Sequence, residues 1–366
     1  MAVTIVHCAD VHLETAFTDL RGGSRRRAAL ADAFTRVVDL ALRRHADALT
    51  IGGDLYEAER AGPQTARFLA AQFARFGGPV FIAPGNHDPH AGGSLLARGA
   101  FPPNVRVFNE ATWLSYPLAD DITLYGFAHT PAEPGPPFAS ARFERAGTRI
   151  ALAHGSDTAR CPPGKRVTAP FTARAVIESG ATLLLTGHYH GGYVERTADG
   201  RPVFAYPGSL EPIKFGEGDR HGALVVTVDG SRVEVEQVDL NRTRVHDLAC
   251  DLDGAESEYA VLALVEDTLA DLGADDYVRL RLVGRPQHGT RVDPALVTDR
   301  FAAALGTFDV LDDTLAHDYE ALAREPTVRG HVVRDLLEAA HTDPEAAEAL
   351  RYALAAFDGR EIAPCG

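Results

Sequence analysis

The sequence predicts an α/β fold, because short apolar stretches alternate with longer stretches of helical periodicity over residues 1–240. The apolar stretches predict buried strands and cover residues 3–7, 48–51, 80–83, 123–125, 150–153 and 182–185. Helical patterns cover residues 25–44, 63–76 and 173–179. Three further strands, at residues 203–205, 222–228 and 232–238, follow with no helix between them. We therefore expect a mixed sheet or two packed sheets.

The pattern changes beyond residue 245, where the sequence predicts a small α+β unit. Strands are expected at residues 245–252, 277–283 and 308–311, and helices at residues 256–272 and 293–305. Residues 326–357 then show helical periodicity, with a stop and restart at Thr342-Asp343-Pro344. The expected parts are a first domain over residues 1–244, a second over residues 245–315 and a C-terminal helical segment over residues 316–366.

Bulk composition is that of a globular protein, with 366 residues, 45% hydrophobic and 24% charged. No uninterrupted apolar stretch reaches the roughly 18 residues of a membrane span, and the first residues do not resemble a signal peptide. The cysteines are scattered, without a Cys-x-x-Cys pair, at positions Cys8, Cys161, Cys250 and Cys365. We expect no disulfide framework, no cysteine zinc site and a cytoplasmic location.

The net charge of −15 is unevenly distributed along the chain. Residues 241–366 contain 12 basic and 25 acidic residues, a net −13, which leaves −2 for residues 1–240. A strongly acidic surface does not coat polyanions non-specifically. Any nucleic acid is therefore expected to meet the first 240 residues.

Five of the predicted strands end in side chains of the metal-ligand type, usually beside glycine. In open α/β sheets, ligand-binding sites form beyond the carboxyl ends of the strands, so these side chains are expected to converge on one crevice. Glycine permits the tight turns and close backbone approach that such loops need. The segments are Asp10-Val11-His12, Gly53-Asp54, Asn86-His87-Asp88, His154-Gly155 and His188-Tyr189-His190.

Carboxylate and imidazole donors without thiolate suit Mn, Fe or Zn. Seven candidate ligands are too many for one ion and suit two ions that share a carboxylate, about 3.5–4 Å apart. Any single histidine beside a glycine is more often an ordinary loop residue. The joint occurrence of five such segments in this order favours a metal site.

In this order, the five segments resemble the calcineurin-like metallophosphoesterase superfamily. The resemblance implies one ion on Asp10, His12 and His190 and a second on Asn86, His154 and His188, with Asp54 bridging both. It also implies a four-layer α-β-β-α sandwich carrying a small α+β cap domain and C-terminal helices.

The same resemblance places His87 at the scissile phosphate, where it would stabilise charge or protonate the leaving oxygen, with Asp88 orienting it. Histidine suits this role because it titrates near neutral pH. A second interpretation of Asp88, a structural cap of its turn, stays open.

Three further segments resemble SbcD-type DNA exonucleases, in the YhaO-like bacterial branch. They are residues 7–13 (His-Cys-Ala-Asp-Val-His-Leu), residues 52–56 (Gly-Gly-Asp-Leu-Tyr) and residues 206–212 (Tyr-Pro-Gly-Ser-Leu-Glu-Pro). This resemblance implies a Mn-dependent DNA exonuclease or endonuclease acting in repair or end processing, with an SMC-like ATPase of the SbcC type as partner. A partner of that kind would bind helices beyond the cap, here residues 326–357, although these helices could equally pack on their own domain.

Three basic residues are the candidates for contacts with DNA. Arg25 and Arg26 follow the first metal segment and could neutralise phosphates, as could Lys214; a solvated helix start explains the arginines equally well. Two other functions stay open: a phosphatase or cyclic-nucleotide phosphodiesterase with the same metals, and a non-catalytic scaffold. Whether the chain forms a homodimer also stays open.

Overall fold

The computed structural model describes residues 2–16, 23–98, 101–144, 146–161, 164–217, 220–287, 290–314, 319–340 and 342–357. The chain forms two compact units. The first comprises Met1–His246 with Asp275–Tyr277, and the second comprises Asp247–Ala274 with Val278–Gly366. The first unit thus ends near the boundary predicted after residue 244, and the boundary predicted after residue 315 stays a prediction.

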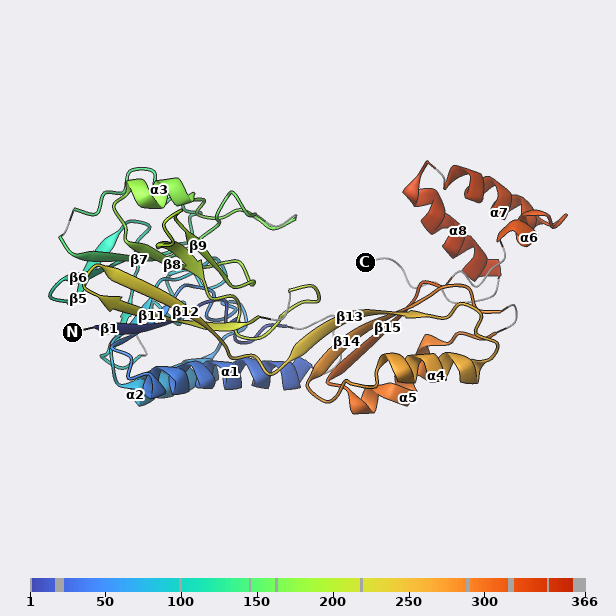
Figure 1. The fold of residues 1–366 in the computed structure, drawn as a ribbon, viewed down its shortest axis with the longest axis horizontal. Helices are drawn as coiled ribbons and strands as arrows, with labels where there is room; N and C mark the ends of the chain where they lie inside the picture. The colour runs from blue at the N-terminus through green and yellow to red at the C-terminus, as the bar shows by residue number, and fades with distance from the viewer. Residues whose placement is uncertain are drawn as a thin grey trace. The chain divides into compact units, whose positions relative to one another are not determined.

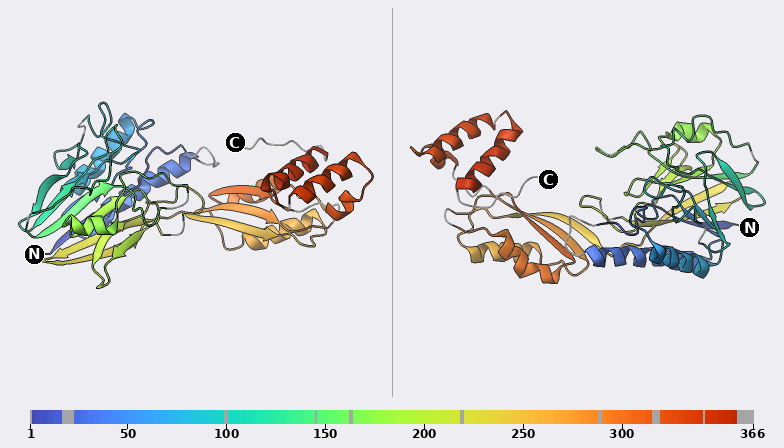
Figure 2. Two further views of the ribbon diagram at one scale, coloured as in Figure 1. Left: turned by 90° about the horizontal axis from the view of Figure 1, so that it is seen from above. Right: turned by 180° about the vertical axis from the view of Figure 1, so that it is seen from behind.

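The first unit contains a six-stranded sheet of order β12-β11-β1-β2-β3-β4. Its strands are β1 (Val3–Cys8), β2 (Ala48–Ile51), β3 (Val80–Ile82), β4 (Val105–Val107), β11 (Gly222–Asp229) and β12 (Arg232–Asp239). The run from β1 to β4 is parallel, whereas β11 and β12 are antiparallel additions. Helices α1 (Gly23–Arg43) and α2 (Pro63–Phe76) lie along its outer face, as the views in Figures 1 and 2 show.

A second six-stranded sheet of order β5-β6-β7-β8-β10-β9 packs against the first. Its strands are β5 (Leu114–Ala119), β6 (Ile122–Gly126), β7 (Thr148–His154), β8 (Leu183–Gly187), β9 (Tyr193–Arg196) and β10 (Pro202–Tyr206). The four central strands are parallel, and the edge strands β5 and β9 are antiparallel. Helix α3 (Ala173–Glu178) covers the outer face of this sheet (Figure 1).

The inner faces of the two sheets enclose an apolar core. Ile5 of β1, Phe81 of β3, Leu152 of β7 and Leu185 of β8 are all fully buried within it. On the outer side of each sheet, a separate apolar cluster packs the sheet against its own helices. The expected α-β-β-α sandwich is therefore confirmed, and of the two predicted arrangements the chain adopts two packed sheets.

The sequence explains why α2 has the bounds that were predicted for it. Pro63 stands at the first helical position, where its missing N–H costs nothing. The helix ends where Gly77 adopts a left-handed conformation with φ 74°, and its N–H caps the Phe73 carbonyl. Leu69 and Phe73 face the sheet and are fully buried.

The second unit contains a three-stranded sheet of order β13-β14-β15, with helices on one face (Figure 1). The elements are β13 (Arg244–Asp251), α4 (Glu258–Thr268), β14 (Asp276–Val283), α5 (Pro294–Phe301), a 3-10 turn (Ala302–Ala304) and β15 (Thr307–Asp312). Val261, Val265 and Val297 of the helices pack against Val278 and Leu280 of β14 in a core of their own. This is the small α+β unit that the sequence predicted.

Three C-terminal helices, α6 (Tyr319–Ala323), α7 (Val328–Ala339) and α8 (Pro344–Phe357), pack on one another. Residues 326–357 were the predicted partner-binding helices. The apolar face of α7, made by Val328, Val332, Val333, Leu336 and Leu337, is partly covered, because Val333 is fully buried against Leu350 and Leu354 of α8. Val328, at 73% exposure, is the member of that face most open to solvent. In the described part of the chain, no helix is both long enough and apolar enough to span a bilayer.

Phe81→Ala tests the core between the sheets. Phe81 is fully buried, with its ring centroid 5.0 Å from that of Tyr116. The cavity should lower the free energy of unfolding by about 3–5 kcal/mol. Urea denaturation measures this loss, and Ile177→Ala on α3, at a side chain that is 53% exposed, serves as the control with a change within about 0.5 kcal/mol. Equal losses in the two variants would contradict this account of the core.

Candidate metal centre

The five segments converge where the carboxyl ends of the parallel strands of both sheets meet. Asp10, Asp54 and Asn86 follow β1, β2 and β3, while His154 ends β7 and His188 follows β8. Hydrogen bonds between the two sheets tie them together there. The ring Nδ1 of His154 lies 2.7 Å from the Gly52 carbonyl, and the backbone N–H of His188 donates to the Asp10 carboxylate at 2.9 Å.

Four of the candidate ligands have strained backbones. The φ angles are 51° at Asp10, 49° at His12, 53° at Asp54 and 112° at His188. Non-glycine residues in this region cost on the order of 1–3 kcal/mol each and are retained where surrounding structure fixes them. Here the N–H of His12 donates to the Asp54 carbonyl at 3.0 Å, which binds the first loop to the second.

Glycine allows the loops to approach this closely. A side-chain carbon on Gly85 would collide with the Asp54 carboxylate, and one on Gly187 would collide with the side chain of Ala9 and the Gly52 carbonyl. Glycine at position 85 therefore leaves room for Asp54, and glycine at position 187 lets the end of β8 approach Ala9 and Gly52.

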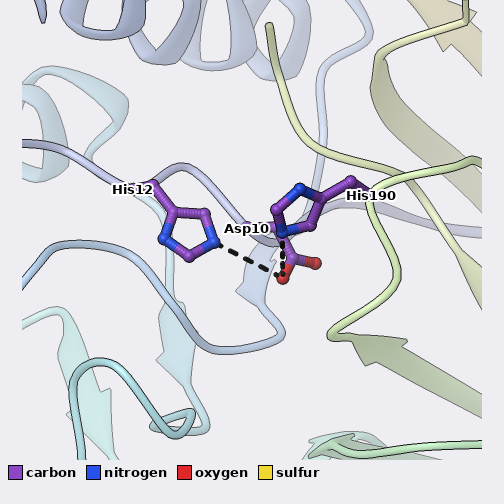
Figure 3. Close-up of side chains that lie close together, drawn as sticks. All are labelled: Asp10, His12 and His190. Atoms are coloured by element: carbon purple, nitrogen blue, oxygen red, sulfur yellow. Dashed lines mark ion pairs between the residues drawn. The ribbon is translucent and has the colours of Figure 1, made fainter. Parts of the chain in front are cut away.

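The first group of candidate ligands is Asp10, His12 and His190, whose donor atoms lie within 4.8 Å of one another. Figure 3 shows the two imidazoles directed at the same carboxylate oxygen. The Nε2 atoms of His12 and His190 each lie 3.9 Å from the Asp10 Oδ1. These separations exceed hydrogen-bond length, so the three donors surround a shared point without satisfying one another.

The second group is Asp54, His154 and His188, again with donor atoms within 4.8 Å of one another. The His154 Nε2 lies 3.2 Å from the Asp54 Oδ2 and 3.1 Å from the amide oxygen of Asn86. The Nε2 of His188 lies 2.9 Å from the Arg166 carbonyl, which leaves its Nδ1 as the donor available to an ion.

Asp54 stands between the two groups. Its Oδ2 lies 3.2 Å from the His154 Nε2 and 3.8 Å from the His12 Nε2, and the residue is only 2% exposed. Burial alone would raise the pKa of Asp54, but His154 and His12 outweigh burial and hold the pKa well below its usual range. A carboxylate kept ionised between two ligand groups has the position and charge of a bridging ligand.

The donors fit a pair of divalent cations. The Nε2 of His12 is buried and has no hydrogen-bond partner among the described residues, although it faces both Asp10 and Asp54. A buried polar atom without a partner lowers the stability of the fold unless a bound group satisfies it. Carboxylate, imidazole and amide donors suit Mn, Fe or Zn.

The expected contact between Asp88 and His87 is absent, and this part of the prediction is corrected. The Asp88 carboxylate is fully buried and accepts the backbone N–H groups of Gly85, Asp54 and Leu55 at 2.7, 3.0 and 2.8 Å. It therefore caps the turn, which is the second interpretation that the sequence left open. Burial and the nearby Asp54 raise the pKa of Asp88 to about 6.

Glu57 takes the place that the prediction gave to Asp88. Its Oε2 lies 2.8 Å from the Nδ1 of His87, and its Oε1 lies 2.7 Å from the Nδ1 of His12. The hydrogen bond that the His87 ring donates to the Glu57 carboxylate raises the pKa of His87, so the ring is held in its protonated form to higher pH. Because Glu57 already satisfies both Nδ1 atoms, the close approach of these three side chains needs no ion of its own.

Glu217 is a second acid that the sequence analysis missed. Its Oε1 lies 2.6 Å from the Nδ1 of His190. Burial would raise the pKa of Glu217, but His190 lowers it to about 2. Glu57 follows Asp54 closely in sequence and could have been suspected for that reason, whereas Glu217 belongs to no segment that was singled out.

One predicted DNA contact is wrong. Arg26 is 4% exposed, its guanidinium donates to the Pro212 carbonyl at 2.5 Å, and it stacks 4.4 Å from the Tyr277 ring centroid. Burial lowers its pKa, and its role is to hold the loop after β10. Lys214 on that loop is exposed as a phosphate contact would be, and the side chain of Arg25 lies outside the described residues.

Two cationic residues not singled out before lie beside the second group. The Arg166 carbonyl is in contact with His188, and the neighbouring Lys165 acts electrostatically on the His188 ring. Burial first, then His154 and Lys165, lower the pKa of His188 to about 4. This ring is therefore neutral at physiological pH, as a metal ligand must be.

Residues 3–192, more than half of the chain, match the family model described as calcineurin-like phosphoesterase. The chain belongs to this family. All of the candidate ligand residues fall within the matched segment, so the candidate metal centre lies inside the family domain.

Three relatives extend the similarity beyond the family domain. The uncharacterized metallophosphoesterase YhaO of Bacillus subtilis (strain 168) is 27% identical over 326 residues, which are 83% of this chain and 77% of YhaO. The DNA double-strand break repair protein Mre11 of Aeropyrum pernix is 26% identical over 332 residues, 84% of this chain and 78% of that protein. Mre11 of Methanopyrus kandleri is 26% identical over 275 residues, 66% of this chain and 57% of that protein.

Asp88→Ala should destabilise the protein even without metal. Its loss leaves three buried N–H groups unsatisfied, and each costs about 1–3 kcal/mol. Urea denaturation in the presence of a chelator should therefore show a loss of about 3 kcal/mol or more. If Asp88→Ala kept full stability and changed only the pH profile of catalysis, the capping role would be wrong.

Metal binding should release a proton. Burial would lower the pKa of His154, but Asp54 and Asp10 raise it to about 9, so the ion-free protein carries this imidazole protonated at pH 7.5. A cation can bind only the neutral ring. Binding should therefore weaken as the pH falls below about 9, and calorimetry in buffers of different ionisation enthalpy measures the released proton. Binding heats that do not depend on the buffer would contradict the assignment of His154.

Proposed function

We propose that the protein is a DNA exonuclease or endonuclease that acts in DNA repair or end processing. It would hydrolyse phosphodiesters with two divalent cations, and Mn is the proposed metal. The observation that carries the proposal is the pair of ligand groups sharing Asp54, with His87 beside them. Fe and Zn remain compatible with the same donors.

The choice of DNA rests on the reach of the similarity. The Mre11 protein of Aeropyrum pernix aligns with 84% of this chain, whereas the family domain ends at residue 192. The similarity therefore includes parts of the chain that phosphoester chemistry alone does not require. A relative described as a double-strand break repair protein supports DNA as the substrate more than it supports a small phosphate ester.

In this proposal, His87 and Glu57 beside the candidate ligands handle the proton of the reaction. When bound, the two cations supply the positive charge that polarises a phosphate oxygen and acidifies a water molecule. The backbone N–H of His87 donates to the Asp54 Oδ1 at 2.8 Å, which fixes the position of the His87 ring beside the cations. Glu57 binds the Nδ1 of that ring, so its Nε2 is left to donate a proton to the leaving oxygen.

Positive charge beside the centre supports binding of a polyanion. Lys165 acts electrostatically on His188 of the second group, and Lys214 is exposed on the loop that carries Glu217, whereas the exposed guanidinium of Arg166 pairs with Glu133. The strongly acidic residues 241–366 would repel a duplex. DNA is therefore proposed to contact the first unit.

The partner and the location belong to the proposal as well. An SMC-like ATPase would have to bind surfaces of α6, α7 and α8 other than the apolar face that closes on α8. A cytoplasmic location agrees with Cys8 and Cys250, which are buried and form no disulfide in the part of the chain that the structure describes.

Three substrates with Mn separate the candidate functions. We expect cleavage of linear DNA and of bis-p-nitrophenyl phosphate, with little hydrolysis of p-nitrophenyl phosphate. Monoester hydrolysis without DNA cleavage would favour the phosphatase hypothesis. Hydrolysis of cyclic nucleotides without DNA cleavage would favour the phosphodiesterase alternative.

His87→Ala should lower kcat for DNA cleavage by about 10²–10⁴-fold, because it removes a general acid. Mn binding should persist, since His87 is not among the proposed ligands, and Arg174→Ala on the exposed surface of α3 is a matched control. Unchanged cleavage by His87→Ala with Mn still bound would contradict the role of His87.

A further inference from the structure

The two ligand groups differ in what lies behind their imidazoles. In the first group, the Nδ1 atoms of His12 and His190 bind carboxylates, with distances of 2.7 Å to Glu57 and 2.6 Å to Glu217. In the second group, the corresponding partners of His154 and His188 are backbone carbonyls, at 2.7 and 2.9 Å.

Glu217 is built into its position. Its side chain is 12% exposed, and its Oε2 accepts the backbone N–H of Ile213 at 2.6 Å while Oε1 faces His190. The loop that carries it is tied to the ligand segment, because the N–H of Ser209 donates to the His190 carbonyl at 3.0 Å. The acid is therefore held against His190 by contacts of the segment that precedes it in the loop.

A carboxylate behind an imidazole fixes the tautomer with the proton on Nδ1. It leaves the lone pair of Nε2 for the ion and makes that nitrogen a stronger donor. A carbonyl fixes the tautomer in the same way but adds no negative charge. The first group also holds Asp10, whereas the second adds the neutral Asn86 to the shared Asp54. Both differences favour a cation at the first group.

We propose that the group of Asp10, His12 and His190 is the higher-affinity metal site and fills first, and that Glu217 is the positioning residue that sets this affinity through His190. The inference rests on the metal centre of the proposed function, but it concerns the order of metal binding and is independent of the substrate.

Titration of the metal-free full chain with Mn, followed by electron paramagnetic resonance of free Mn, tests this. Wild-type protein should bind two ions in two separate steps. Glu217→Gln removes the charge and one of the two acceptors, and should weaken the first step about 10–100-fold while leaving the second unchanged. Asn86→Ala should weaken the second step alone. Glu178→Gln, at an exposed side chain of α3, should change neither step.

Thermal unfolding in the presence of a chelator checks that each variant is folded. Glu217→Asp keeps the negative charge on a shorter side chain and should weaken the first step less than Glu217→Gln. Two equal steps in the wild-type protein, a first step unaffected by Glu217→Gln, or a first step weakened by Asn86→Ala would each overturn the inference and leave the proposed function standing. Failure to bind Mn at all would overturn both. Because the wild-type titration alone can contradict the inference, a poorly folded variant does not remove the test.

Discussion

The arrangement of the centre depends on a buried carboxylate, Asp54, held ionised where the two sheets meet. Its backbone N–H and that of Leu55 are bound by Asp88, its carboxylate accepts the N–H of His87, and its Oδ2 faces His154 and His12. Removing a carboxylate from water is expensive unless positive charge compensates it. The imidazoles provide part of this compensation, and two cations would provide the rest. The strained turns and the close glycines follow from the same need.

Two acidic residues, Glu57 and Glu217, hold the imidazoles of the first ligand group in position. Glu57 joins His12 to His87, so one side chain links a metal ligand to the proposed proton donor. Glu217 holds His190 from a loop that is also anchored by Arg26 through the Pro212 carbonyl. A change in that loop can therefore affect the first ligand group without altering a candidate ligand. The surroundings of the two candidate ligand groups differ because of residues that are not candidate ligands themselves.

Sequence alone predicted the parts that local pattern determines. The ends of β1, β2, β3, β7 and β8 were found because apolar strands followed by Gly, Asp, Asn or His have a direct physical meaning. The edge strands β4, β5 and β9 were missed, since their half-exposed residues have a weak apolar pattern. Arg26 was misassigned and Glu217 was missed for one reason. Their partners, Tyr277 and His190, are distant in the chain, and only folding brings them together.

Diffraction from crystals soaked in Mn, with anomalous data, tests the central claim most directly. The account predicts two anomalous peaks about 3.5–4 Å apart, on either side of the Asp54 carboxylate. The Asp10, His12 and His190 side chains should surround one peak, and Asn86, His154 and His188 the other. A single peak, or a peak held between Glu57 and His87, would contradict it.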